Sequence, residues 1–226
     1  MTQSPHLIEH LEVEPPTTPR GTIIWLHGLG ADAQDFAPMV TTLNFTQALP
    51  IRFIFPNAPM RPITINNGYV MRAWYDITSM SKIEGHLDTA GIDISVQQIH
   101  QFIAHEIARG IPAEKIILAG FSQGALIALT AGLRYPAKLA GVLALSGYLP
   151  YSAESLSKTI ITSARMPIFL GHGTEDTVVP YLLSLHAHEM LKRCGYTTTF
   201  KSYPVAHTVC PEEVADIKTW ISQVYA

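Results

Sequence analysis

Residues 120–124, which read Gly-Phe-Ser-Gln-Gly, constrain the fold of this chain more than any other stretch. They follow the apolar run 116–119 and precede a proline-free apolar stretch typical of a buried helix. A serine at the tip of such a strand-turn-helix unit is forced to a positive φ, and the crowding leaves little room for side chains two positions away. The pattern therefore predicts a nucleophile elbow with Ser122 at its tip. The alternative is an ordinary strand-helix turn with a polar tip.

The length and charge of the chain limit its class. At 226 residues it fits one large α/β domain, and we expect a single domain over residues 1–226. Charged residues make up 15% and the formal net charge is −3, so no nucleic-acid partner is expected. The first residues lack the basic and apolar regions of a secretory signal, and no apolar run reaches the ~18 residues of a membrane span. We therefore expect a cytoplasmic protein without a transmembrane segment.

The small number of cysteines is compatible with the expected cytoplasmic location. Cys194 and Cys210 are the only two cysteines in the sequence, which is too few for a disulfide framework. In a reducing compartment both are expected to be free thiols. Neither is given a functional role.

Apolar runs with β propensity recur along the chain, and several are separated by stretches with helical periodicity. The expected strands cover residues 22–26, 52–55, 115–119, 139–145, 167–170 and 197–203, with a further edge strand at 6–13. Helices are expected over 92–107, ending near Gly110, and after Pro180 and Pro211. This alternation predicts an α/β fold with a mostly parallel central sheet and helices on both faces.

Residues 56–90 interrupt this alternation. The stretch contains three prolines, the turn pair Asn67-Gly68 and the aromatic pair Trp74-Tyr75. Long loops in compact domains are uncommon and often functional. We interpret this stretch as a long ordered loop that shapes a binding site, with a purely structural excursion as the alternative.

A serine hydroxyl is a weak nucleophile, so it needs a general base and a carboxylate that orients the base. In hydrolases with a nucleophile elbow these follow the serine in the order Asp or Glu, then His. Residues 171–180 follow an expected strand and supply Glu175 and Asp176. Asp176 is favoured because it lies later in the loop, directly before the expected helix entry, although Glu175 stays open on spacing alone.

The base has to be chosen among ten histidines. His207 lies in a turn after the last expected strand, and it alone follows the acidic loop in the required order. His27 and His172 end strands and could line the site. The others fall on the terminus or on polar helix faces, where a solvated or packing role is expected: His6, His10, His86, His100, His105, His186 and His188.

Attack on an acyl carbonyl creates an oxyanion that needs two preset donors. One usually comes from the residue after the nucleophile, here the backbone N–H of Gln123. The other is expected from the glycine-containing loop 26–30, where the N–H of Leu29 is the predicted donor. A phosphate-binding role for this loop is disfavoured, because it lacks the third glycine of a dinucleotide fingerprint and the Lys-Ser/Thr of a P-loop.

Six stretches together carry a family resemblance: 26–32, 55–59, 72–76, 120–125, 172–180 and 207–213. They resemble the acyl-protein thioesterase and bacterial carboxylesterase branch of the α/β-hydrolases, the phospholipase/carboxylesterase family, from about residue 20 onward. The resemblance implies an α/β-hydrolase fold without a separate cap domain. It also implies a triad of Ser122, Asp176 and His207, which settles Asp176 over Glu175, and oxyanion donors at Leu29 and Gln123.

The resemblance further implies that Trp74 is a wall residue of the acyl site. One departure is Ala206, directly before the candidate base, where relatives often carry glycine. We expect this change to alter the turn without disabling His207.

The predicted function is a serine carboxylesterase that hydrolyses a small-molecule acyl ester through an acyl-enzyme intermediate, with no metal or organic cofactor. An acyl-protein thioesterase or a lysophospholipase would use the same triad, with an acyl-thioester, an acylated protein or a lysophospholipid as substrate. A non-catalytic ligand-binding module on the same fold is less favoured, because every catalytic position is filled. A peptidase is disfavoured because no extra domain selects peptides. The fairly neutral surface is compatible with a homodimer.

Overall fold

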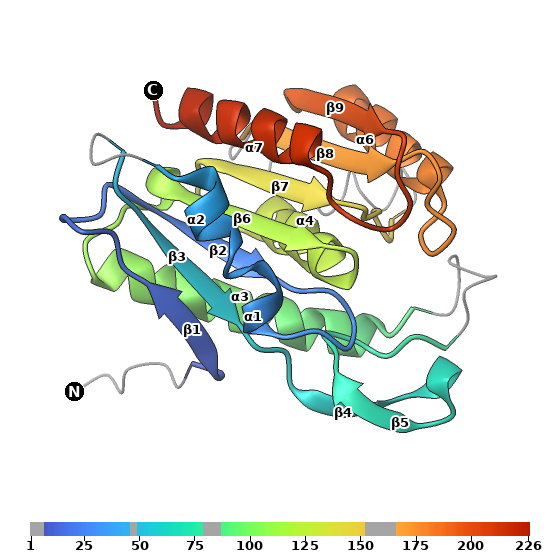
Figure 1. The fold of residues 1–226 in the computed structure, drawn as a ribbon. Coiled ribbons are helices and arrows are strands. Elements are labelled where there is room, and N and C mark those ends of the chain that lie inside the picture. The colour runs from blue at the N-terminus through green and yellow to red at the C-terminus, as the bar shows by residue number, and fades with distance from the viewer. Residues whose placement is uncertain (1–6, 46–48, 79–86, 152–165) are drawn as a thin grey trace.

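The computed structural model describes residues 7–45, 49–78, 87–151 and 166–226. Its centre is a seven-stranded sheet in the order β1-β3-β2-β6-β7-β8-β9 (Figure 1). Only β1 runs antiparallel to its neighbour, and every other pair in the sheet is parallel. The strands are β1 His10–Val13, β2 Gly21–Leu26, β3 Ile51–Pro56, β6 Ile116–Phe121, β7 Gly141–Leu145, β8 Ile168–Gly173 and β9 Thr198–Tyr203. The predicted mostly parallel sheet is confirmed.

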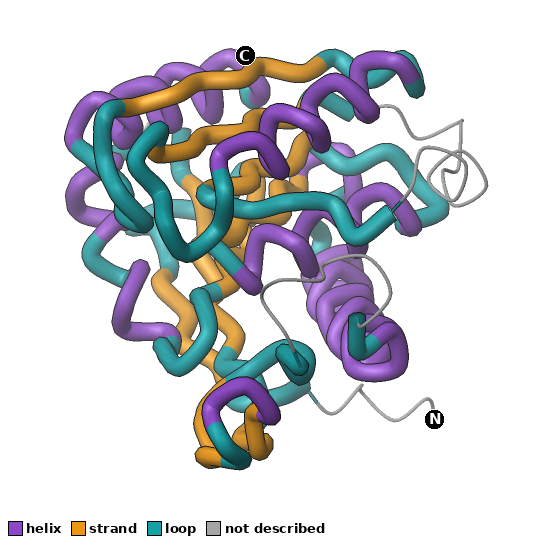
Figure 2. The backbone as a smooth tube through the Cα atoms, turned by 90° about the vertical axis from the view of Figure 1, so that its right-hand side faces the viewer, coloured by secondary structure: helices purple, strands orange, loops and turns teal. Residues whose placement is uncertain are grey.

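Helices cover both faces of the sheet, as Figure 2 shows in a view turned by 90°. On one face lie α3 Thr89–Ala108, α4 Gln123–Arg134 and α6 Tyr181–Arg193. On the other lie α1 Ala33–Phe36, α2 Met39–Leu43 and α7 Pro211–Val224. Gly110 follows α3 with a φ of 95°, so it ends this helix as the sequence predicts. Within the described part of the chain, no helix combines the length and apolar character that a membrane span requires.

Residues 79–86 of the stretch 56–90 lie outside the described residues, and the described part is only partly a loop, which corrects the prediction. It contains an antiparallel hairpin of β4 Met60–Ile63 and β5 Tyr69–Arg72. Asn67 and Gly68 form its turn with φ values of 54° and 78°, as the turn pair suggested. The hairpin escaped sequence analysis because each strand has four residues, most of them are not buried, and Pro62 lies inside β4. Such strands carry no clear burial pattern.

Two buried glutamates differ in their surroundings. Glu106 in α3 is fully buried but well partnered, since it accepts hydrogen bonds from Thr22 Oγ1 at 2.5 Å and Arg52 Nη1 at 2.6 Å. Glu213 in the first turn of α7 is 1% exposed, and neither of its carboxyl oxygens has a hydrogen-bond partner among the described residues. The carboxyl packs against Gly171 of β8, where a Cβ would lie 2.1 Å from Glu213 Oε1. An unpartnered buried carboxylate is costly, so this group favours its neutral form.

Burial raises the pKa of Glu213 to about 7, from an ordinary value of 4.5, and outweighs a smaller lowering by the Cys210 backbone N–H. Between these two values the folded chain holds a proton that the unfolded chain has lost. The preferential protonation of Glu213 in the folded state therefore stabilises the fold. This contribution to the free energy of unfolding is complete below pH 4.5 and is lost as the pH rises towards 7.

We expect Glu213→Gln to be more stable than the wild type at pH 8, by up to about 3 kcal/mol, and to lose this advantage near pH 5. The neutral amide removes the cost of ionising a buried acid. The measurement is urea unfolding of both proteins from pH 5 to 8. Glu212→Gln, an exposed neighbour in the same helix turn, is the control and should follow the wild type. Equal pH slopes for Glu213→Gln and the wild type would contradict this account.

Candidate active site

The turn between β6 and α4 has the geometry of a nucleophile elbow. Ser122 sits between the last residue of β6 and the first residue of α4 with φ 55° and ψ −119°, a conformation that L-residues rarely adopt. A Cβ at Gly120 would lie 2.3 Å from the Gly124 carbonyl oxygen, and a Cβ at Gly124 would lie 2.5 Å from the His27 carbonyl oxygen. Both positions therefore require glycine. The strained serine is held at the carboxyl edge of the sheet by contacts that only this sequence pattern permits.

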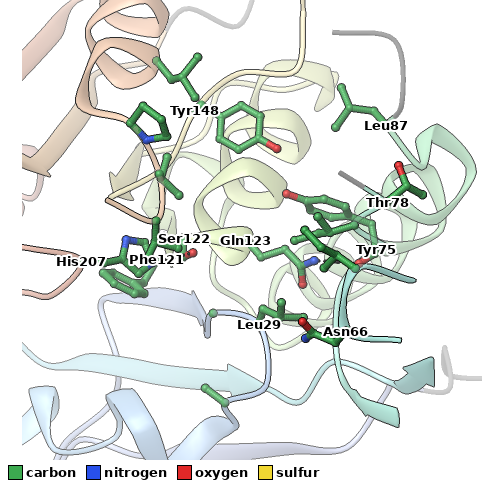
Figure 3. Close-up of a pocket in the computed structure, with 18 of the residues that line it drawn as sticks. Leu29, Asn66, Tyr75, Thr78, Leu87, Phe121, Ser122, Gln123, Tyr148 and His207 are labelled. Atoms are coloured by element: carbon green, nitrogen blue, oxygen red, sulfur yellow. Dashed lines mark hydrogen bonds between the residues drawn. The ribbon is translucent and has the colours of Figure 1, made fainter. Parts of the chain in front are cut away.

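Three side chains that are far apart in the sequence form one hydrogen-bond chain. His207 Nδ1 lies 2.6 Å from Asp176 Oδ2, and His207 Nε2 lies 2.9 Å from Ser122 Oγ. With the proton on Nδ1, the imidazole donates to the carboxylate and accepts from the serine hydroxyl. The Phe121 ring packs against the imidazole of His207, with ring centroids 4.7 Å apart. Figure 3 shows Ser122, Phe121 and His207 together at one end of a cavity.

The two loops that carry Asp176 and His207 are joined by backbone hydrogen bonds. Glu175 N–H donates to the Val205 carbonyl at 3.1 Å. At the end of β8, a Cβ on Gly173 would lie 2.2 Å from that same carbonyl oxygen. Ala206 is not among the described residues with a positive φ, so alanine fits this turn without backbone strain.

The structure separates the two candidate carboxylates. Asp176 has a fully buried side chain, and its Oδ1 accepts backbone N–H groups from Val178 and Val179, each at 2.8 Å. His172 Nε2 lies 3.3 Å from its Oδ2 and 2.9 Å from the Val179 carbonyl. Glu175 is exposed. The geometry brings Asp176, and not Glu175, to His207.

His27 and His172, the other histidines at strand ends, are buried and do not line the cavity. His27 Nε2 accepts the Ala58 N–H at 3.0 Å, so the proton must lie on Nδ1, which is 2.7 Å from the Gly28 carbonyl oxygen. Burial lowers the pKa of both imidazoles, which favours their neutral forms. Of the remaining histidines, His6 and His86 lie outside the described residues.

Leu29 and Gln123, the predicted oxyanion donors, line the same cavity as Ser122 and His207 (Figure 3). Gln123 is the first residue of α4, where backbone N–H groups have no partner within the helix and the helix dipole favours negative charge. The residues predicted as nucleophile, base and oxyanion donors therefore line one cavity.

The cavity has a volume of about 430 Å³ and a largely apolar wall. Tyr75 and Tyr148 contribute phenol groups, and burial raises the pKa of both, so they stay neutral at physiological pH. Apolar wall residues come from the hairpin and the segment after it, from the residues before α3, and from the start of α6: Ile65, Ile77, Leu87, Val179 and Leu183. The site can therefore accept an apolar chain beside the serine.

Trp74 is not a wall residue, which corrects the prediction. Its side chain is fully buried and does not line the cavity, and its indole Nε1–H donates to the His27 carbonyl at 3.0 Å. The neighbouring Tyr75 lines the cavity instead. Both aromatic residues were visible in the sequence, but their order alone does not say which one faces the space. Phe121, inside the elbow motif, was also missed as a contact of the base.

Comparisons with known proteins identify the family of this chain. The family model described as phospholipase/carboxylesterase matches residues 8–225. The chain is 34% identical to carboxylesterase SOBER1 of Arabidopsis thaliana over 206 residues, with 90% of each chain covered. It is 43% identical to acyl-protein thioesterase 1 of Schizosaccharomyces pombe over 173 residues, which covers 76% of this chain and 75% of the relative.

Solved structures place the fold in the same group. The crystal structure of Arabidopsis thaliana SOBER1 superposes with a TM-score of 0.85 at 33% identity, covering 92% of this chain and all of that one. Zea mays acyl-protein thioesterase 2 superposes with a TM-score of 0.84 at 30% identity, covering 97% of this chain and all of that one. These relatives are hydrolases, and the expected α/β-hydrolase fold is confirmed. The chain belongs to the phospholipase/carboxylesterase family of α/β-hydrolases.

Proposed function

We propose that this hydrolase is a carboxylesterase in which Ser122 is the nucleophile, His207 the general base and Asp176 the residue that orients the base. The observation that carries the proposal is the continuous hydrogen-bond chain of 2.6 Å and 2.9 Å through the His207 imidazole. Each contact lies within the range expected for proton transfer between positioned groups. The names of the relatives, which are carboxylesterases and acyl-protein thioesterases, support the same class.

The reaction follows from this arrangement. Ser122 Oγ attacks the acyl carbonyl carbon while His207 Nε2 takes the hydroxyl proton, and Asp176 stabilises the imidazolium that forms. The oxyanion is stabilised by the N–H groups of Leu29 and Gln123. Collapse of this intermediate breaks the bond to the leaving group, which takes the proton from His207. Water then attacks the acyl-enzyme by the same steps and releases the acid.

The substrate class follows from the cavity. An apolar wall of this volume suits a fatty acyl chain, and esters are the leading substrates. Thioesters are the second candidate, because several relatives are named acyl-protein thioesterases. A lysophospholipid is a further candidate with the same chemistry. The expectations of a single domain, a cytoplasmic location and a homodimer stay predictions.

Replacing the triad residues tests the mechanism. We expect Ser122→Ala and His207→Ala to lower kcat by about 10⁵- to 10⁶-fold, and Asp176→Asn by about 10⁴-fold. The double variant of Ser122 and His207 should be no worse than either single one, because the triad acts as a unit. The measurement is hydrolysis of a p-nitrophenyl ester by folded protein.

A fluorophosphonate probe checks the nucleophile directly. It should label the wild type and not Ser122→Ala. The control is Glu175→Gln, since this exposed carboxylate neighbours Asp176 and should keep full activity. Full activity of His207→Ala, or a folded wild type that the probe does not label, would refute the proposal.

The cavity predicts the response to acyl length. Each added methylene that enters the cavity is worth about 0.8 kcal/mol, so we expect kcat/KM to rise by up to about fourfold per methylene until the cavity is full. Ile65→Trp should shift the optimum to shorter chains, because Ile65 lines the cavity. Val70→Trp is the matched control, since Val70 is exposed on the same hairpin and does not line the cavity. A p-nitrophenyl ester series measures this, and a flat wild-type profile would contradict the acyl assignment.

A further inference from the structure

Residues 72–75, here called the clasp segment, link three parts of the site. The segment leaves the hairpin at the end of β5, contacts the loop of Leu29 and the first residue of α4, and reaches the cavity wall at Tyr75. Its central residue, Trp74, is fully buried although its indole carries a polar N–H group. The hydrogen-bond partners of this buried segment indicate its role.

The clasp segment holds the backbone on both sides of Leu29. Before Leu29, Trp74 Nε1–H donates to the His27 carbonyl at 3.0 Å. After Leu29, the Arg72 carbonyl accepts the Gly30 N–H at 2.9 Å. The donor loop is therefore fixed at two points by one short segment.

The His27 side chain fixes the peptide between these two points. Its Nδ1–H donates to the Gly28 carbonyl at 2.7 Å. The carbonyl of Gly28 and the N–H of Leu29 belong to one planar trans peptide, so they point in opposite directions. Holding the Gly28 carbonyl therefore sets the direction of the Leu29 N–H and opposes a flip of this peptide.

The same segment holds the second donor residue. Gln123 Oε1 accepts the Trp74 N–H at 2.8 Å, and Gln123 Nε2 donates to the Tyr75 carbonyl at 2.8 Å. Its side chain is thus fixed from both ends, and the residue is only 3% exposed. The Trp74 carbonyl in turn accepts a hydrogen bond from Ser95 Oγ on α3. The clasp segment is therefore anchored to the core as well as to the Leu29 loop and to Gln123 of α4.

We propose that the clasp segment positions both oxyanion donors and that Trp74 is the positioning residue through which it acts. This inference rests on the proposed function, because it concerns the oxyanion of that reaction. Trp74 does not touch the substrate, and its indole sets where the His27 carbonyl and the Leu29 loop lie. Replacing Trp74 should therefore weaken stabilisation of the transition state while leaving ground-state binding in place.

Trp74→Phe tests this by removing the indole N–H. Because small misplacements of catalytic groups can cost about 10²-fold, we expect kcat to fall by about ten- to a hundredfold for every acyl length, with KM changed by less than about twofold. A trifluoromethyl ketone, which forms a serine-bound alkoxide in the oxyanion site, should lose affinity by the same factor as kcat/KM. The number of active sites is counted with the fluorophosphonate probe.

The chain offers a matched control. Trp25 is 1% exposed in β2, and its indole N–H has no hydrogen-bond partner among the described residues. Trp25→Phe therefore removes an equally buried indole without removing a hydrogen bond, and it should keep the wild-type kcat per active site. If Trp74→Phe does not fold, Ser95→Ala takes its place, because it loosens the same segment, and kcat and ketone affinity should again fall together.

Several outcomes would overturn the inference. They are an unchanged kcat and ketone affinity in Trp74→Phe, a loss confined to long acyl chains, an increase in KM alone, or an equal loss in Trp25→Phe. For Ser95→Ala, unchanged kcat and ketone affinity would have the same meaning. The proposed function fails separately if the wild type is neither labelled by the probe nor active on esters. A labelled, active wild type with a fully active Trp74→Phe variant refutes the clasp alone.

Discussion

The site depends on one close approach, between the first turn of α4 and the end of β2. Gly124 lies directly against the carbonyl oxygens of Leu26 and His27, at a separation that a Cβ would not permit. The helix can therefore begin immediately where β6 ends, and Ser122 is held at a φ of 55° between them. The same contact brings the loop after β2 beside the serine. The strain of the elbow is supported by a helix in which every residue except Arg134 is buried.

The parallel arrangement of the strands brings the other two residues of the proposed triad to Ser122. Because β6, β8 and β9 run in the same direction, the loops after them meet at one edge of the sheet (Figure 1). Ser122, Asp176 and His207 follow these strands. These residues are far apart in the sequence, but the sheet brings their side chains within hydrogen-bond distance of one another.

The sequence predicts the parts of this site that depend on local chemistry. Gly120 and Gly124 were informative because only glycine fits there, and His207 was found because chain order excludes the other histidines. The role of Trp74 could not be predicted in the same way. Which of Trp74 and Tyr75 faces the cavity is decided by contacts with Gln123 and His27, which are distant in the sequence. The hairpin was missed for a different reason, since its exposed strands leave little pattern of burial.

The position of β9 at the edge of the sheet affects how easily the enzyme loses activity under denaturing conditions. Among the described strands it is the last in the sheet and pairs with β8 alone, whereas β6, which leads to Ser122, lies between two neighbours. Segments at the margin of a sheet open more easily than its centre. A brief detachment of the end of β9 would carry His207 away, while α7 stayed packed over the middle of the sheet through Ile217, Trp220 and Ile221. Loss of hydrolytic activity would then precede loss of the folded core.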